Sequence, residues 1–318
     1  MVDGVDKFLR RYPDSPVVEE VLGTLDPGEI RARVHGLDPE VTEIFYFAAS
    51  VGALFGVRRR DGDRVAIKVH GRFRDEEYLE QMQAVQEALA DAGFPAPRPL
   101  GREAFVTWEQ WIDDGEFRDA HEPEVRGAMA RTLVRLHDLA TATGVRPRRR
   151  FFPLGEGELW PVPHNALFDF EATTAGAEWI DEIARAAKAI RDLPIGREVV
   201  GHGDWSAKHF RFDPELRPTV LYDWDSLNTD REPSLVGTAA ASFTYTEELP
   251  VDVWPSLVEV RAFVDDYEAA RDGPFTEDER RGAYAGAVYL SAYAMRCGHS
   301  LGGPIDPNPL TQLAEALL

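Results

Sequence analysis

Residues 199–227 read VVGHGDWSAKHFRFDPELRPTVLYDWDSL, which combines apolar runs with two acidic clusters. Apolar runs at both ends predict two short strands, and the polar DPELRP segment predicts one tight loop between them. Each strand ends in an acidic cluster, first His202-Gly203-Asp204 and then Asp223-Trp224-Asp225. His209, a residue type that can bind a metal, follows shortly after the first cluster.

The order and spacing of these residues suit phosphoryl transfer. That chemistry asks a protein mainly to position the reactants, to neutralise charge through Mg²⁺ and to supply one carboxylate that orients the hydroxyl nucleophile. Kinase catalytic loops have the form H-x-D, then a metal-binding residue, then a second metal-binding Asp on the next hairpin. Those four places are occupied by His202, Asp204, His209 and Asp223. We therefore expect Asp204 to be catalytic and Asp223 and His209 to bind the metal.

With these residues the chain resembles the aminoglycoside phosphotransferase and choline kinase family of small-molecule kinases. The family loop reads H-G-D-x-x-x-x-N and its metal strand reads I-D-F or I-D-W, against HGD and YDWD here. His209 stands where the family usually has Asn. The resemblance implies ATP and Mg²⁺ as cofactors. A simpler alternative is a hairpin whose carboxylates only cap turns.

A second hairpin is predicted upstream, where the β-prone runs 54–60 and 64–70 flank Asp61-Gly62. Its second strand contains VAIK, the pattern of the kinase strand whose lysine pairs with the α and β phosphates. Lys68 is therefore expected to bind the nucleotide, although alternating strands often expose a lysine on their wet face. In kinases of this type a helix Glu holds the lysine. Here Gln81 or Met82 stands nearest to that position, so no partner is predicted.

Small residues at 48–53 precede this hairpin and would let backbone N–H groups approach phosphates closely. The loop is similar to the family's phosphate loop, and this resemblance implies that Ser50 and Gly52 contact the nucleotide. It lacks the family's Ser-Asn pair and is not a G-x-G-x-x-G loop. A plain turn between two strands is the alternative.

Residues 104–111, AFVTWEQW, predict a strand whose end resembles the family's hinge between two lobes. The hinge backbone of a kinase hydrogen-bonds the adenine edge, so the resemblance implies adenine contacts from Gln110, Trp111 and Ile112. The alternative for the tryptophans is ordinary core packing.

Helical periodicity marks most of the remaining chain. The predicted helices span residues 74–92, 122–140, 179–193, 256–270 and 276–301. The ending LVRLHDLA of the second resembles the family helix beneath the catalytic loop, and its His137 is expected to be a packed structural histidine. Thr276 to Glu279 matches a capping box. Residues 31–34 are predicted to open the first strand.

Composition limits the classes of function. A net charge of −21 argues against nucleic-acid binding, which needs basic faces, but would attract a cationic substrate or simply keep the protein soluble. The single cysteine, Cys297, excludes an internal disulfide, and no signal peptide is expected, so a cytoplasmic location is predicted. The longest nearly apolar run, 283–295, falls short of the ~18 residues of a membrane span.

The combined interpretation is an α+β, two-lobed protein-kinase-like fold. Residues 1–112 are expected to form a small antiparallel β lobe that binds nucleotide, and residues 113–318 a larger helical lobe with the catalytic and acceptor sites. The expected reaction moves the γ-phosphoryl group of ATP to a hydroxyl of a small molecule.

Two rival interpretations remain. His209 and the missing helix Glu favour a catalytically silent nucleotide-binding module. A protein kinase would use the same parts. Against it, residues 223–225 are expected to lead almost directly into the next helix, and no A-P-E segment follows.

Overall fold

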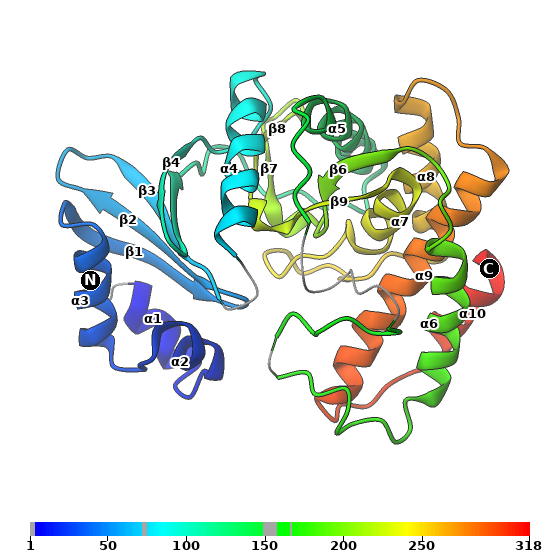
Figure 1. Cartoon of the computed structure of the whole chain (residues 1–318), viewed down its shortest axis with the longest axis horizontal. Helices are drawn as coiled ribbons and strands as arrows, with labels where there is room; N and C mark the ends of the chain where they lie inside the picture. Colours follow the sequence, from blue (N-terminus) through cyan, green and yellow to red (C-terminus); the bar gives the residue numbers. More distant parts are fainter. Residues whose placement is uncertain (1–3, 72–74, 149–157, 166) are drawn as a thin grey trace.

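A computed structural model describes residues 4–71, 75–148, 158–165 and 167–318. A five-stranded antiparallel sheet in the first third of the chain is followed by a larger, mainly helical part (Figure 1). The predicted α+β class, with a small β part and a larger helical part, is confirmed. Among the described residues, no helix combines the length and the apolar character needed to cross a membrane.

The sheet has the strand order β1-β2-β3-β5-β4. Its strands are β1 Val41–Ala49, β2 Ala53–Arg59, β3 Arg64–Val69, β4 Pro99–Glu103 and β5 Val106–Gln110. The predicted hairpin across Asp61-Gly62 is formed by β2 and β3, with Leu54 opposite Lys68. Lys68 in turn lies opposite Thr107 on β5, so the predicted nucleotide lysine occupies a central strand.

Three N-terminal helices cover one face of this sheet (Figure 1). They are α1 Gly4–Arg11, α2 Pro16–Leu22 and α3 Pro27–Leu37. The prediction that residues 31–34 open a strand is wrong, because they belong to α3. Asp26 caps this helix by accepting a hydrogen bond from the Glu29 backbone at 2.8 Å, and Ile30 and Val34, one turn apart, are buried against the sheet.

Helix α4 Glu76–Asp91 joins β3 to β4 and lies between the sheet and the helical part (Figure 1). Its buried side chains belong to the hydrophobic core of the larger part. That part contains six further helices among the described residues: α5 Pro123–Ala142, α6 Glu178–Arg191, α7 Glu232–Ser242, α8 Leu257–Ala270, α9 Glu277–Ser300 and α10 Asn308–Leu317. The capping box predicted at Thr276 and Glu279 is confirmed at the start of α9.

The stretch 199–227 folds into more strands than predicted. Strand β6 Glu198–His202 pairs with β9 Leu227–Arg231, and between them β7 Phe210–Phe212 and β8 Pro218–Leu221 form a hairpin. The prediction of two strands joined by one loop is wrong, because the outer strands pair with each other across the inner hairpin. The prediction that residues 223–225 lead almost directly into a helix is also wrong, since β9 precedes α7.

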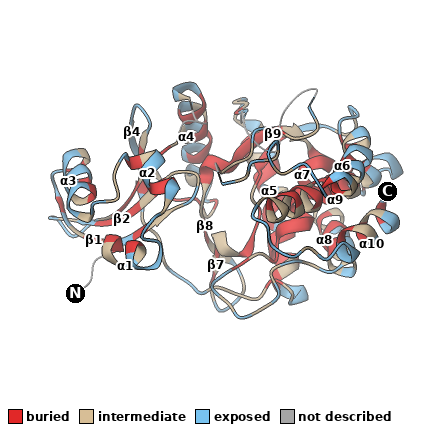
Figure 2. Ribbon diagram, turned by 90° about the horizontal axis from the view of Figure 1, so that it is seen from below, coloured by how far each residue is buried: buried red, intermediate tan, exposed pale blue. Residues whose placement is uncertain are grey.

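Helix α7 is buried along its whole length (Figure 2). It packs against α9 through small residues, and it begins where β9 ends. The pair β6–β9 therefore packs against a buried helix, and the turns that follow β6 and β8 bury Trp205 and Trp224 in the core of the larger part.

Candidate active site

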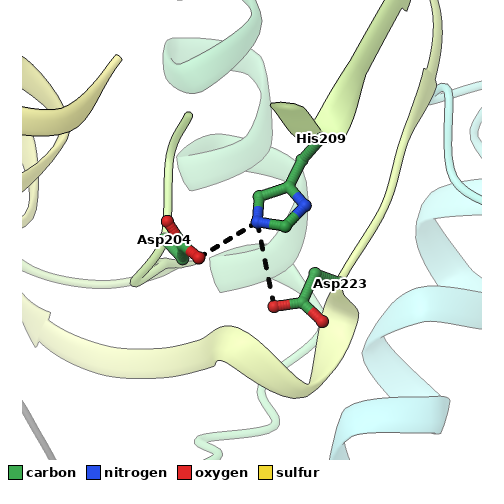
Figure 3. Close-up of side chains that lie close together, drawn as sticks. All are labelled: Asp204, His209 and Asp223. Carbon is green, nitrogen blue, oxygen red and sulfur yellow. Dashed lines mark hydrogen bonds and ion pairs between the residues drawn. The ribbon is translucent and has the colours of Figure 1, made fainter. Parts of the chain in front are cut away.

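Asp204, His209 and Asp223 meet between β6 and the β7–β8 hairpin. Each offers one carboxylate oxygen or imidazole nitrogen, and these atoms all lie within 4.8 Å of one another (Figure 3). His209 Nε2 is 3.0 Å from Asp204 Oδ2 and 3.9 Å from Asp223 Oδ2. The structure thus brings together the three residues predicted for catalysis and metal binding.

Two neighbouring turns place the acidic side chains. Asp204 follows the end of β6, and Asp223 follows the end of β8. The backbone of Asp223 is left-handed, with φ 65° and ψ 46°, a conformation that Asp and Asn adopt more readily than most residues. The Gly203 N–H donates to the Ser226 carbonyl at 2.7 Å, which ties the two turns together.

The Asp204 carboxylate has several polar neighbours. Lys208 Nζ lies 3.0 Å from Oδ2, and the Ser206 hydroxyl donates to Oδ1 at 3.0 Å. Burial by itself would raise the pKa of Asp204, but Lys208 and His209 hold it well below its usual value. The group is therefore an ionised hydrogen-bond acceptor at neutral pH, as a residue that orients a hydroxyl nucleophile needs to be.

His202 stabilises the turn that carries Asp204 through hydrogen bonds of its ring. Its Nδ1 accepts a hydrogen bond from the Asp204 backbone at 3.2 Å, and its Nε2 lies 3.0 Å from the Tyr222 carbonyl. Burial lowers the pKa of His202 to about 4, so the ring is neutral and Nε2 carries the proton. His202 thereby links the backbone of the Asp204 turn to the residue just before Asp223.

Lys68 reaches from the sheet to the second acidic cluster. Its Nζ donates to Asp223 Oδ1 at 2.9 Å and to Asp225 Oδ1 at 3.3 Å. Burial would lower the pKa of Lys68, but the two carboxylates raise it above its ordinary value. The partner that the sequence left unnamed is therefore this pair of carboxylates and not an acidic side chain of α4.

Helix α4 contributes to the site in another way. The Tyr78 hydroxyl is 2.8 Å from both the Asp225 and the Leu227 carbonyls, so α4 holds the turn that carries the lysine partners. Gln86 donates to Glu109 on β5 at 2.7 Å, and burial raises the pKa of the Glu109 carboxyl although Lys68 and Gln86 lower it.

Sequence reasoning missed Tyr78, Glu109 and Lys208. Lys208 had a local signal, because a lysine four residues after an aspartate can pair with it. Tyr78 and Glu109 had none, since their contacts join distant segments.

Ser50 and Gly52 lie in the turn between β1 and β2. The Ser50 N–H donates to the Gly52 carbonyl at 3.0 Å, and the Val51 N–H donates to the Ser50 hydroxyl at 2.7 Å. A Cβ on Gly52 would come within 2.7 Å of the Val69 carbonyl, so this position needs glycine. Within the described parts of the chain, no hydrogen bond joins this turn to Asp204, His209 or Asp223.

The predicted hinge residues continue β5. The Gln110 N–H donates to the Arg98 carbonyl at 2.9 Å and the Trp111 N–H to the Arg64 carbonyl at 3.1 Å. The Ile112 carbonyl accepts a hydrogen bond from the Tyr222 hydroxyl at 2.5 Å. The Trp111 ring packs edge-on against Phe45, with centroids 5.0 Å apart. The hinge is thus tied directly to the residue before Asp223.

The central trio of the site, Asp204, His209 and Asp223, can bind a divalent cation. An ion that holds its ligands at about 2.0–2.6 Å needs them within roughly 5 Å of one another, and carboxylates and imidazole are both common ligands. Asp204, His209 and Asp223 meet this requirement.

Comparison with known proteins agrees with this geometry. A model of the phosphotransferase enzyme family matches residues 48–230, which is more than half of the chain. No curated protein sequence matches the chain.

Solved structures share the fold at low sequence identity. An amicoumacin kinase aligns with a TM-score of 0.63 at 10% identity, covering 91% of this chain and 92% of that one. An ethanolamine kinase from Plasmodium vivax aligns at 0.56 and 11% identity, covering 98% and 93%. A choline kinase from Streptococcus pneumoniae aligns at 0.52 and 15% identity, covering 91% and 97%.

These alignments confirm the kinase-like two-lobed fold, and the family match extends from the turn before β2 to β9. The chain therefore belongs to the phosphotransferase enzyme family, and it is a phosphotransferase of the small-molecule kinase class.

Proposed function

We propose that this protein transfers the γ-phosphoryl group of ATP to a hydroxyl group of a small, cationic molecule. The observation that carries the proposal is the meeting of Asp204 with His209 and Asp223, next to Lys68. An ionised carboxylate beside a cation site, with a lysine close by, is the set of groups that phosphoryl transfer requires.

Each residue of the site has a proposed task. Asp204 accepts the hydrogen bond of the acceptor hydroxyl and takes its proton as the acceptor oxygen bonds to the γ-phosphorus. The bond from that phosphorus to the β–γ bridging oxygen breaks, and ADP leaves. Asp223 and His209 hold Mg²⁺, which when bound would neutralise charge on the phosphates. Lys68 binds the α and β phosphates. To reach them it would give up part of its contact with Asp223 and Asp225.

The nucleotide is proposed to lie against the lobe of residues 1–112. In this proposal Ser50 and Gly52 face the phosphates, and the backbone at Gln110, Trp111 and Ile112 meets the adenine. The amicoumacin kinase was solved in complex with AMP-PNP and Ca²⁺, which supports a nucleoside triphosphate and a divalent cation here. The lobe of residues 113–318 would bind the acceptor.

The proposal of a cationic acceptor rests on charge near the site. Lys208 lies over the Tyr245 ring at 4.9 Å, and the Tyr245 hydroxyl donates to Glu247 at 3.2 Å. Lys208 also pairs with Asp204, so one aromatic ring and one carboxylate, those of Tyr245 and Glu247, lie near the catalytic aspartate, and both groups attract ammonium ions. An aminoglycoside or related amino sugar has this chemistry. We propose the cytoplasm as the compartment, because the chain has one cysteine only.

The test is Asp204→Asn. It should lower kcat by about 10²–10⁴-fold while leaving ATP affinity nearly unchanged, because it removes proton acceptance but no phosphate contact. Asp61, an exposed residue in the turn between β2 and β3, offers a matched control: Asp61→Asn should behave as wild type. Near wild-type kcat in Asp204→Asn would refute the catalytic assignment, and ATP binding without any turnover in the wild type would favour a silent module.

A further inference from the structure

The donor atoms of the central trio differ in chemical type. Asp204 and Asp223 each offer a hard carboxylate oxygen, whereas His209 offers an imidazole nitrogen (Figure 3). Mg²⁺ strongly prefers oxygen ligands and keeps several waters. Imidazole binds first-row transition metals, and Mn²⁺, the weakest binder of that series, also accepts carboxylates. The identity of residue 209 therefore bears on which ion this site selects.

The side chain of His209 is oriented so that Nε2 of its ring points toward the carboxylates of Asp204 and Asp223. Its backbone N–H donates to the Ser206 carbonyl at 3.0 Å, and its carbonyl accepts from the Tyr222 N–H at 2.9 Å. These bonds fix the residue just before β7. The ring is largely buried, and its Nε2 faces Asp204 and Asp223. A nitrogen placed in this way between two carboxylates needs only a small movement to share an ion with them.

We propose that His209 makes the cation site prefer Mn²⁺ to Mg²⁺ by binding the ion through Nε2. This inference rests on the proposed function, because it concerns the same site, but it adds the selectivity for the ion. The imidazole adds a nitrogen donor that gains more with Mn²⁺ than with Mg²⁺. Mg²⁺ would still bind, through the carboxylates and the phosphates of the nucleotide.

The matched variant is His209→Asn, which replaces the nitrogen donor by an amide oxygen at a similar reach. Mn²⁺ binding is measured by electron paramagnetic resonance, from the loss of the free-ion signal, and Mg²⁺ is then added as a competitor. The ratio of the Mg²⁺ to the Mn²⁺ dissociation constant should fall by roughly tenfold in the variant, equivalent to about 1.4 kcal/mol. His35→Asn, an exposed histidine on α3, should leave the ratio unchanged.

A spectroscopic readout tests the bond itself. Pulsed electron paramagnetic resonance of bound Mn²⁺ should show ¹⁴N coupling from one imidazole in the wild type, and this coupling should vanish in His209→Asn. Asp223→Ala should lose most Mn²⁺ binding, which assigns the signal to this site. Circular dichroism checks that each variant is folded, and His209→Gln repeats the test if His209→Asn is not.

The outcomes separate the two proposals. An unchanged ion ratio, no imidazole coupling or no Mn²⁺ binding in the wild type would overturn the role of His209, while phosphoryl transfer supported by Mg²⁺ would leave the proposed function intact. Imidazole coupling together with a lowered ratio in the variant supports the inference. If this result came with no turnover on any acceptor, the proposed function would fail and the selectivity would stand.

Discussion

Lys68 contacts two aspartates whose surroundings differ. The side chain of Asp223 is 32% exposed and also faces His209, whereas that of Asp225 is 11% exposed and lies 3.4 Å from His70 Nδ1. Burial and the neighbouring Asp225 would raise the pKa of Asp223, but Lys68 and His209 lower it. Asp223 is therefore the carboxylate better placed to bind an ion, and Asp225 would remain as a partner of Lys68 when it does.

This difference predicts unequal effects of two substitutions. Asp223→Ala should abolish the dependence of ATP affinity on Mg²⁺, because it removes a carboxylate ligand. Asp225→Ala should weaken that dependence less. Titration calorimetry with ATP, at saturating Mg²⁺ and with EDTA, measures both. Unchanged Mg²⁺·ATP affinity in Asp223→Ala would show that the ion binds elsewhere.

At the level of elements, the packing of α7 on α9 sets the position of β9. The two helix backbones approach so closely that a Cβ on Gly237 would lie 1.8 Å from the Ala283 carbonyl oxygen. Real Cβ atoms do not come so near, so a side chain at this position forces the helices apart. Because α7 follows β9 directly, such a shift would also disturb the turn that carries Asp223.

Gly237→Ala is therefore expected to destabilise the protein. Overpacking of this kind costs typically about 1–3 kcal/mol, and here the obstacle is backbone, so we expect the upper end. Gly298→Ala in α9 is the matched control, because no atom lies within 4 Å of its Cβ position, and alanine should stabilise the helix by up to about 1 kcal/mol. Urea unfolding followed by circular dichroism compares them. Equal midpoints for the two variants would contradict the close approach.

At the scale of the whole molecule, the net charge of −21 makes a prediction about substrates. If part of this charge acts at the acceptor site, KM for a cationic acceptor should rise clearly between low and physiological ionic strength, as charges become screened over about 10 Å. A neutral acceptor should show almost no change. Glu247→Gln, which removes the carboxylate beside Tyr245, should reduce the salt effect more than Glu315→Gln on α10.

A screen of sugars, nucleosides, amino alcohols and aminoglycosides supplies the substrates for this comparison. Turnover of neutral or anionic acceptors alone would refute the cationic acceptor but leave the kinase assignment standing. Surface acidity would then serve solubility only.

Stability should depend on pH through a buried histidine that joins α5 to α8. His137 Nδ1 is 2.8 Å from the Tyr267 hydroxyl, and burial lowers the pKa of the ring to about 3. His137 is thus a packed structural residue, as predicted. An unfolded histidine titrates near 6.5, so between these values the unfolded chain binds the additional proton. The free energy of unfolding must therefore fall as pH falls from 6.5 toward 3.

The slope from this residue is at most about 1.4 kcal/mol per pH unit. His137→Gln should be less stable at pH 7 but should lose this part of the slope, whereas His35→Gln should keep it. Urea unfolding between pH 5 and 7 measures the difference. A wild-type slope in His137→Gln would show that the histidine is not the group concerned.

Much of the fold could be predicted because its signals are local. The hairpin at Asp61-Gly62 and the capping box at Thr276 depend on residues within a few positions of each other. One wrong prediction, the strand at residues 31–34, came from misreading a local signal, because the Asp26 cap and Pro27 mark the start of a helix there. The pairing of β6 with β9 could not be predicted, because it spans an intervening hairpin.

The amino-acid sequence was enough to predict the residues at the centre of the site and the family to which they point. Only a short loop and one hairpin separate Asp204, His209 and Asp223 along the chain, and these two segments bring the three side chains close together. The carboxylates that hold Lys68 could be identified only in the folded protein, since Asp223 lies 155 residues away from the lysine. The physical reason is that such a contact depends on how the sheet, α4 and the β8–β9 turn pack together, and no local spacing encodes that packing.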